Sequence, residues 1–358
     1  MTTLREFYRG KRVFVTGHTG FKGAWLSQML LLLDAEVTGY ALAPPTDPSL
    51  FGLLRLANDM FSINGDIRDY DQLKAAFDQA KPEIVLHMAA QPIVLEGYRD
   101  PRGTYETNTM GTVNLLECVR HCDCVCGVVN VTTDKVYRNL EDARAFIEDD
   151  VLDGFDPYSN SKSCSELVTG CYVNSFFRQQ TPGGGLPVST VRSANVIGGG
   201  DFAANRIVPD CVRAAAGHRS LVLRNPDAVR PYQHVLESLS AYLLLAMRQW
   251  ETPALAGAYN IGPGQDGCVR TEDLVRLFRE ALGAPDYVVR QNAHAPSEAD
   301  FLILNCAKAG DVLGWRPKLS IGQAVALTAD WTRAWLGGED IGAMTRGQIE
   351  NYGTMGTA

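Results

Sequence analysis

The sequence predicts an α/β fold: a Rossmann-type doubly wound parallel sheet with a smaller, interleaved C-terminal lobe. Two observations favour this fold class. Short apolar runs alternate with helical patterns through the first half of the chain, and a glycine-rich loop joins the first run to the first helix. Strands that alternate with helices build an open parallel sheet covered on both faces, and each crossover is expected to be right-handed.

The first expected strand, residues 12–16, leads into a glycine-rich loop and then into a helical pattern. In that context three glycines suit a tight turn, the close approach of a pyrophosphate and the packing of helix on strand. The helix N-terminus offers unpaired N–H groups and a positive dipole for phosphates. The spacing G-x-x-G-x-x-G differs by one residue from the usual fingerprint, and glycines that only turn a corner are the alternative. The residues assigned to this dinucleotide site are Gly17, His18, Gly20, Phe21, Lys22 and Gly23.

The second expected strand, residues 36–41, does not end in the acidic residue that usually holds the ribose 2′-hydroxyl of NAD. Lys22 either approaches a 2′-phosphate or packs its stem on the surface. The residues alone therefore leave NAD and NADP open, and NAD is the cofactor that we expect. After the third strand, Asp66 beside Ile67 offers an acceptor for the adenine amino group. A plain turn residue is an equal alternative for Asp66.

The unbroken apolar run at residues 82–88 is typical of a strand buried on both faces of a parallel sheet. Small residues follow it, at a point where a cofactor must come close. The helical pattern at 104–120 carries Asn108, a candidate hydrogen-bonding partner near the nicotinamide. The cofactor-binding residues expected after this strand are Ala89, Ala90, Gln91 and Asn108.

Tyr158 and Lys162 lie four residues apart on an expected helix, so their side chains share one face. A lysine ammonium there favours tyrosinate and lowers the phenol pKa from its usual ~10 toward neutrality. Such a phenolate can take the proton of a sugar hydroxyl while the carbon beneath it gives up hydride, and Thr133 can hydrogen-bond that hydroxyl. Asp134 and Lys135 add an acid and a base that a plain alcohol dehydrogenase does not need. The alternative is a packed tyrosine and a solvated Asp-Lys pair.

Composition narrows the class of protein. The 358 residues carry a net charge of −8 without a basic tract, which argues against a nucleic-acid binder. No apolar segment approaches the ~20 residues of a membrane span, and the N-terminus lacks the apolar core of a signal peptide. We expect a cytoplasmic enzyme with an NAD(P)-binding domain over residues 1–186. Residues 187–358 would mainly form a substrate-binding lobe, with segments that return to the first domain.

Nine cysteines suggest free thiols in a reducing compartment. Cys118, Cys122, Cys124 and Cys126 crowd around His121, and thiolate and imidazole are zinc ligands. The knuckle spacing with a second pair downstream is missing, and free cysteine also packs as a small hydrophobe. We therefore expect no metal site.

These motifs resemble the extended short-chain dehydrogenases/reductases, and within them the nucleotide-sugar dehydratase branch, closest to its CDP-glucose 4,6-dehydratase subfamily. The resemblance extends from Lys11 to Tyr352. In related dehydratases the position of Lys135 usually holds glutamate, whereas the Asp-Lys pair marks the CDP-glucose subfamily. In the 4-epimerase branch both positions are uncharged. The most specific segments are residues 17–23, 39–46, 89–92, 131–135, 156–162, 195–201 and 230–235.

The resemblance implies a lyase that regenerates its tightly held cofactor in each turnover. Tyr158 would remove the C4 hydroxyl proton of CDP-glucose, with Thr133 orienting that hydroxyl, while C4 passes hydride to the cofactor. Lys135 would then take the C5 proton and Asp134 would help the C6 hydroxyl leave as water. Return of hydride to C6 would give CDP-4-keto-6-deoxyglucose, a step in deoxysugar and lipopolysaccharide O-antigen biosynthesis. A homodimer or homotetramer is the expected assembly.

The expected substrate is a nucleotide sugar bound by the second lobe. Arg230 is the best candidate for the diphosphate because a guanidinium matches phosphate geometry. Weaker candidates are Asn195, Arg206 and Arg224, for which a capping asparagine or a surface arginine is the alternative.

Four positions depart from the family pattern and leave the exact nucleotide and sugar open. Leu95 stands where arginine is usual, Gly97 where serine is usual, Ala194 where glycine is usual and Ser297 where histidine is usual. Two rival functions remain. An NAD-dependent nucleotide-sugar 4-epimerase would share the Tyr-Lys pair without needing the Asp-Lys pair. A non-catalytic dinucleotide-binding sensor would have no reason to keep the catalytic set together.

Overall fold

A seven-stranded parallel sheet forms the centre of the protein in the computed structural model, which describes residues 2–140, 144–178, 185–223, 225–283, 286–290 and 301–354. The strand order is β10-β6-β5-β4-β1-β2-β3. The chain winds outward in both directions from β1, which confirms the predicted doubly wound sheet. The strands are β1 (Arg12–Thr16), β2 (Glu36–Ala41), β3 (Phe61–Asn64), β4 (Ile84–His87), β5 (Gly127–Val131), β6 (Val188–Ser193) and β10 (Ala258–Ile261).

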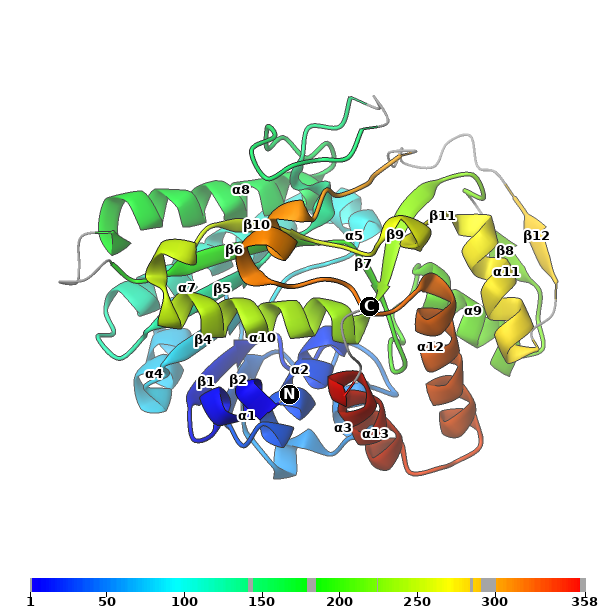
Figure 1. Cartoon of the computed structure of the whole chain (residues 1–358), viewed down its shortest axis with the longest axis horizontal. Helices are drawn as coiled ribbons and strands as arrows, with labels where there is room; N and C mark the ends of the chain where they lie inside the picture. The colour runs from blue at the N-terminus through cyan, green and yellow to red at the C-terminus, as the bar shows by residue number, and fades with distance from the viewer. Residues whose placement is uncertain are drawn as a thin grey trace.

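Helices cover both faces of this sheet, and alternating strand residues point to opposite faces. Val13 and Val15 of β1 pack in one hydrophobic cluster, while Phe14 between them packs in the other. Figure 1 shows α10 in front of the sheet and α8 along its upper edge. Helices of the first cluster are α1 (Thr2–Tyr8), α2 (Phe21–Leu32), α3 (Leu50–Leu53), α10 (Val235–Glu251), the C-terminal part of α12 (Ile321–Leu336) and α13 (Ile341–Thr354). Helices of the second cluster are α4 (Tyr70–Ala80), α7 (Gly111–Arg120) and, through its half-buried C-terminal turns, α8 (Pro157–Tyr172).

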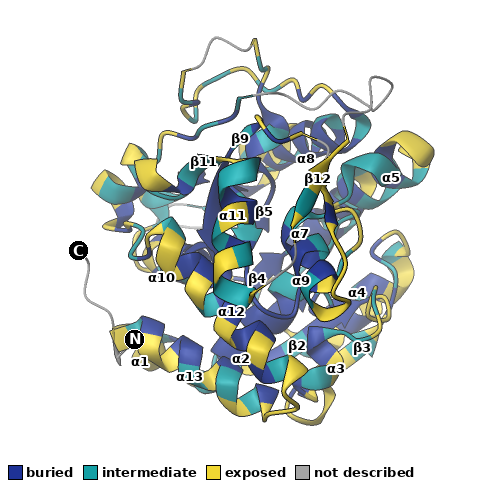
Figure 2. Cartoon of the chain, turned by 90° about the vertical axis from the view of Figure 1, so that its right-hand side faces the viewer, coloured by how far each residue is buried: buried dark blue, intermediate teal, exposed yellow. Residues whose placement is uncertain are grey.

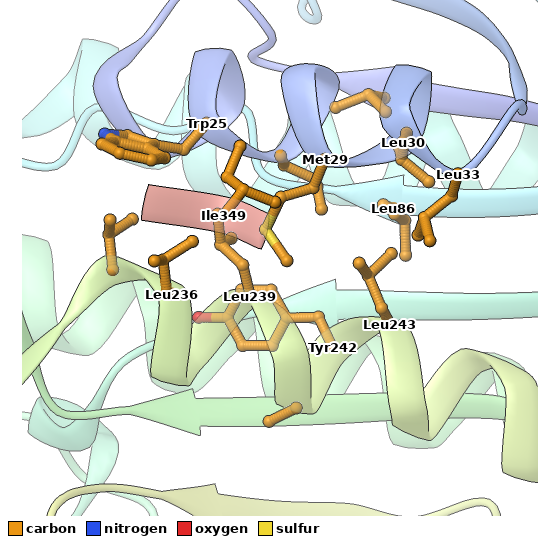
Figure 3. Close-up of a cluster of buried hydrophobic side chains, with 14 of the residues drawn as sticks. Trp25, Met29, Leu30, Leu33, Leu86, Leu236, Leu239, Tyr242, Leu243 and Ile349 are labelled. Atoms are coloured by element: carbon orange, nitrogen blue, oxygen red, sulfur yellow. The ribbon is translucent and has the colours of Figure 1, made fainter. Parts of the chain in front are cut away.

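The layer between α2 and α10 is a dry core. Trp25 and Met29 of α2 meet Leu239 and Tyr242 of α10, with Ile349 of α13 between the two helices (Figure 3). Figure 2 shows the strands β4 and β5 fully buried, while the helices around them expose their outer faces. This core fixes the start of α2, and therefore the glycine loop, against the first half of α10.

A second lobe is built from shorter elements around its own hydrophobic cluster. It lies at the right of Figure 1, next to the carboxyl ends of the main strands. Its strands are β7 (Asn195–Ile197), β8 (Leu221–Leu223), β9 (Val229–His234), β11 (Cys268–Arg270) and β12 (Tyr287–Val289), in sheets of order β11-β9-β7 and β12-β8. Its helices are α9 (Ile207–Ala216), α11 (Thr271–Leu282) and α12 (Ile321–Leu336). Between β9 and β11 of this lobe, the chain returns to the main sheet through α10 and β10.

The helical pattern expected at 104–120 is broken in the structure. It consists of α6 (Pro101–Tyr105), a π-helical turn (Glu106–Met110) and α7. A single π turn inside a helix is often found at functional sites. The short helix α5 (Val94–Arg99) precedes it. No helix in the described ranges is both long and apolar enough to cross a membrane.

Candidate active site

Two of the three loop glycines are required by the fold, and the third faces open space. Gly17 has φ +77°, and a Cβ there would lie 2.8 Å from the backbone nitrogen of Ala89. A Cβ on Gly23 would lie 2.1 Å from the carbonyl oxygen of Gly17. A Cβ on Gly20 would meet only that same carbonyl oxygen, at 3.4 Å. Gly20 is also the N-cap of α2 without a side-chain cap, so the unpaired N–H groups of this helix face a site that suits a pyrophosphate.

The side chain of His18 is not placed to contact a cofactor. It is fully buried, with Nε2 2.7 Å from Ser62 Oγ and its ring edge-on to Phe51. A Cβ on Gly39 would overlap the ring at 2.3 Å, so the ring fills the space that this glycine leaves. Burial lowers the pKa of His18 to about 4. A contact of His18 with the cofactor stays a prediction, and the buried ring leaves the backbone of this residue for it.

Lys22 points toward the catalytic end of the sheet. Its Nζ donates to Tyr242 Oη at 2.6 Å and lies 4.9 Å from the centre of that ring. Burial first, and then the charge of Arg206, lower the pKa of Lys22 to about 7, while Asp134 opposes them. These contacts direct Lys22 toward Tyr242, and a role in holding a 2′-phosphate stays a prediction.

The adenine side of the loop keeps an ionised carboxylate. Arg68 pairs with Asp66 at 2.6 Å and lowers the pKa of Asp66, whose side chain stays 27% exposed. The side chain of Ile67 belongs to the core and packs under Gly111. Asp66 can therefore still accept a hydrogen bond, whereas Ile67 offers only its backbone.

Asn108 braces the site and has no donor left for a cofactor. Its Oδ1 accepts from the backbone nitrogen of Gln91 at 2.8 Å. Its Nδ2 donates to the carbonyl of Gln91 at 3.1 Å and to Ser161 Oγ at 2.9 Å. The side chain is 1% exposed. Asn108 on the π turn thus links the chain after β4 to α8, and its contact with the cofactor stays a prediction. The residues Ala89 and Ala90 lie half-buried in that segment.

The five predicted catalytic residues come together where β5 ends and α8 begins. Thr133 Oγ1 donates to Asp134 Oδ1 at 3.0 Å, and Asp134 is 1% exposed. Lys135 Nζ lies 3.6 Å from the same carboxylate oxygen. Tyr158 is the second residue of α8, which Asp156 caps through the backbone nitrogen of Ser159. The Asp-Lys pair therefore faces the site, which excludes the solvated-loop alternative.

The protonation of Tyr158 differs from the sequence-based prediction. Burial raises the pKa of Tyr158, and this effect outweighs the hydrogen bond with Thr133 and the charge of Lys135, which lower it. Lys162 Nζ donates to the carbonyl of Val131 at 3.0 Å, and the predicted effect of its charge on Tyr158 stays a prediction. Burial, followed by the charge of Lys22, lowers the pKa of Lys162 itself to about 8. The hydrogen bond with Thr133 and the charges of Lys135 and Arg206 therefore favour ionisation of the buried phenol.

Asp134 Oδ2 is buried and has no hydrogen-bond partner within the described part of the chain. A buried carboxylate oxygen without a partner costs free energy, so such an atom points to a proton or a bound group. Its neighbours are the threonine and lysine that the chemistry requires. This orphaned atom fits a substrate hydroxyl.

The substrate-side residues approach the catalytic group from the second lobe. Asn195 Oδ1 on β7 accepts from Lys135 Nζ at 3.4 Å. Arg206 pairs with Asp201 at 3.1 Å, and its charge lowers the pKa of Tyr158. Arg230 is buried on β9, two residues before the strand partner of Asn195. The candidate Arg224 and the departure at Ser297 lie outside the described residues.

The cysteine cluster carries no metal-binding geometry in the described ranges, where no group of three or more suitable side chains converges. Cys118 on α7 packs in the second hydrophobic cluster, and burial raises its thiol pKa to about 12. All nine cysteines are free thiols.

Sequence reasoning missed Glu166 and Arg192. They form an ion pair at 3.0 Å with side chains 3% and 5% exposed, directly behind the catalytic strand. The signal was present, because Glu166 continues the four-residue spacing of Tyr158 and Lys162 along α8.

The chain is similar to several nucleotide-sugar enzymes. A family model described as GDP-mannose 4,6 dehydratase matches residues 14–328. The chain is 43% identical to the CDP-glucose 4,6-dehydratase of Salmonella typhimurium over 97% of this chain and 98% of that protein. It is 31% identical to the dTDP-glucose 4,6-dehydratase of Streptomyces antibioticus over 90% of this chain and 93% of that protein.

Solved structures agree. The dTDP-glucose 4,6-dehydratase of Streptomyces venezuelae, solved with NAD, is similar at TM-score 0.79 and 25% identity, covering 91% of this chain and 98% of that chain. The UDP-glucose 4-epimerase of Thermus thermophilus, also in complex with NAD, is similar at TM-score 0.77 and 25% identity, covering 90% and 98%. The fold and the Tyr-Lys site define an extended short-chain dehydrogenase/reductase. Within that class, the chain belongs to the GDP-mannose 4,6 dehydratase family, which confirms the predicted dehydratase branch.

Proposed function

We propose that this protein is a nucleotide-sugar 4,6-dehydratase, a hydro-lyase that converts CDP-glucose to CDP-4-keto-6-deoxyglucose with tightly held NAD. The observation that carries the proposal is the buried Asp134–Lys135 pair beside Thr133 and Tyr158. An epimerase moves hydride at C4 only and has no use for a second acid and base. The identity of 43% to a CDP-glucose 4,6-dehydratase supports the same conclusion.

The residues present fit a dinucleotide. The start of α2 is open at Gly20, where the N–H groups can bind the pyrophosphate. Asp66 offers its carboxylate to the adenine, and the segment Ala89–Gln91 borders the nicotinamide. NAD, when bound there, supplies a hydride acceptor and donor.

The first half of the reaction needs a base at the C4 hydroxyl. Tyr158 takes that proton, and Thr133 holds the hydroxyl in place. The charge of Lys135 and the hydrogen bond from Thr133 favour the phenolate against the effect of burial. The same two residues that follow β5 therefore prepare the base that starts the reaction.

The second half removes water across C5 and C6. A ketone at C4 acidifies the C5 proton, which Lys135 takes in its neutral form. Asp134 gives a proton to the departing C6 hydroxyl, and its orphaned Oδ2 is the atom suited to reach that hydroxyl. Lys135 Nζ and Asp134 Oδ1 lie 3.6 Å apart, so a proton has only a short distance to move between them.

The remaining parts of the proposal concern binding and context. Arg206, Arg230 and Asn195 bind the nucleotide diphosphate from the second lobe, which residues 187–358 mainly form, while residues 1–186 form the NAD-binding domain. The enzyme is a cytoplasmic homodimer or homotetramer that supplies a deoxysugar precursor for lipopolysaccharide O-antigen.

The test is incubation of the purified protein with CDP-glucose in heavy water, without added reductant. We expect a product lighter by one water that carries deuterium at C5, read by mass spectrometry. The dTDP-, GDP- and UDP-glucose analogues serve as controls for the base. A product of unchanged mass, epimerised at C4, would overturn the proposal in favour of the 4-epimerase.

A further inference from the structure

One face of α8 is fastened to the end of β5 at three successive points. Its side chains at positions 158, 162 and 166 lie one turn apart on the same face of the helix. Each contacts a different residue of the strand end. The contacts are Tyr158 with Thr133, Lys162 with the carbonyl of Val131, and Glu166 with the hydroxyl of Thr132.

The third contact belongs to a buried carboxylate whose oxygens are both occupied. Glu166 Oε1 accepts from Thr132 Oγ1 at 2.5 Å. Its Oε2 accepts from Thr190 Oγ1 at 2.7 Å and from Arg192 Nη2 at 3.0 Å. A buried ion pair is costly unless its atoms are well paired, and here the pairing on the carboxylate side is complete. The carboxylate is therefore held in one position behind the catalytic strand.

Arg192 is held from the other side as well. Its Nη1 donates to Tyr137 Oη at 2.9 Å and to the carbonyl of Glu148 at 2.7 Å. Both partners lie in the segment that follows the catalytic Asp-Lys pair. The ion pair thus joins α8, β6 and this segment, and it keeps a negative charge one helical turn from Lys162.

That charge bears on the protonation of Lys162. The titratable groups that interact with Lys162 are Lys22 from α2, His87 from β4 and Glu166 on α8. Burial and Lys22 lower the pKa of Lys162, and Glu166 raises it. His87 has a pKa of about 3 and is neutral above that pH. Glu166 is therefore the group among these that stabilises the ammonium form.

We propose that Glu166 is a positioning residue of the dehydratase: it fixes the strand residue that precedes Thr133 and keeps Lys162 cationic at neutral pH. The proposal rests on the proposed function only in that its readout is turnover of the nucleotide sugar. Arg192 acts together with Glu166: it holds the carboxylate in place, and its positive charge reduces the effect of the carboxylate on Lys162.

The readout is the alkaline limb of the pH profile of C4 oxidation, measured in single turnover by the absorbance of the reduced dinucleotide. The variant Lys162→Arg tests whether deprotonation of Lys162 causes the alkaline limb, since arginine keeps its charge throughout this pH range. The limb should be absent in this variant. A limb that persists in Lys162→Arg would contradict the role of the Lys162 charge.

Glu166→Gln keeps the size of the side chain and removes its charge. We expect the midpoint of the limb to move to lower pH by about one unit, since loss of a nearby opposite charge lowers a lysine pKa. Arg192→Met should move it in the opposite direction, and the double variant should return it toward the wild-type value. Thr190→Val is the matched control: it removes a hydrogen bond from the same carboxylate without a change in charge, and should leave the midpoint in place.

A uniform loss of rate in Glu166→Gln at every pH, with an unmoved midpoint, would overturn the proposal and leave Glu166 a purely structural residue. Circular dichroism and NAD binding verify that each variant is folded. If Glu166→Gln does not fold, the shift in Arg192→Met and an unmoved midpoint in Glu166→Asp decide the question. A wild-type protein that fails to dehydrate CDP-glucose would instead refute the proposed function, so the two failures are distinguishable.

Discussion

Replacing Lys135 should separate the two halves of the proposed reaction. Lys135→Met removes the C5 base and also the charge that lowers the pKa of Tyr158. General base catalysis contributes roughly 10²–10⁴-fold, so dehydration should slow by about that factor. The effect on C4 oxidation should be smaller, because a change of about one unit in the pKa of Tyr158 corresponds to about tenfold in rate. Reduced dinucleotide should therefore accumulate.

Lys135→Arg provides the matched control. It keeps a positive charge near the Asp134 carboxylate, which Lys135 Nζ approaches to 3.6 Å, but a guanidinium cannot act as a base at neutral pH. C4 oxidation should then proceed at close to the wild-type rate, while dehydration stays blocked. The assay is single-turnover absorbance of the reduced dinucleotide together with mass spectrometry of the sugar product. Normal release of dehydrated product by either variant would refute the assignment of Lys135 as the base.

Three further predictions concern the phenol, the glycine loop and the buried histidines. Tyr158→Phe should bind NAD normally but lose several orders of magnitude in turnover; near-normal turnover would place the base elsewhere. Gly23→Ala, whose Cβ would lie 2.1 Å from the Gly17 carbonyl oxygen, should lower the melting temperature. Gly20→Ala should mainly weaken NAD binding. Equal melting temperatures of the Gly20→Ala and Gly23→Ala variants would contradict the different roles of the two glycines. Burial lowers the pKa values of His18 and His234 to about 4 and about 3. Between these values and pH ~6.5 the unfolded chain binds more protons than the folded one, so the free energy of unfolding should be highest above pH ~6.5 and should decrease as the pH falls toward 4. Urea unfolding at pH 7 and pH 5 tests this, and equal stability would contradict it.

The sequence was most informative where a residue type is required by local geometry. A positive φ at Gly17 and a close backbone approach at Gly23 can be met only by glycine, so strand, loop and helix were predictable together. The catalytic grouping was also predictable, because the four-residue spacing of a helix places Tyr158 and Lys162 on one face whatever the tertiary structure.

The sequence was least informative where burial determines the environment of a side chain. The sequence around each residue does not indicate that Gly39 leaves room for the ring of His18. It also does not indicate that the side chain of Asn108, on a π turn, makes all its hydrogen bonds within the protein. The pKa of Tyr158 was predicted from one neighbouring charge, whereas in the structure burial is the larger effect. Desolvation depends on every element packed around a group, and it cannot be derived from the spacing of two residues.

Burial acts in opposite directions on the groups of this site, and that explains its arrangement of charges. It raises the pKa of Tyr158 and lowers those of Lys22 and Lys162 to about 7 and about 8. The pKa values of the phenol and the ammonium groups thus move apart, so burial favours a neutral phenol beside a neutral amine, although the chemistry needs a phenolate beside a cation. The carboxylates of Asp134 and Glu166 each raise the pKa of one lysine, Asp134 that of Lys22 and Glu166 that of Lys162. Asp134 also raises the pKa of Tyr158, whereas Glu166 lies two turns further along α8, behind Lys162. The carboxylate that performs chemistry is therefore separate from the one that holds Lys162 charged, and only the first has to change its protonation during turnover.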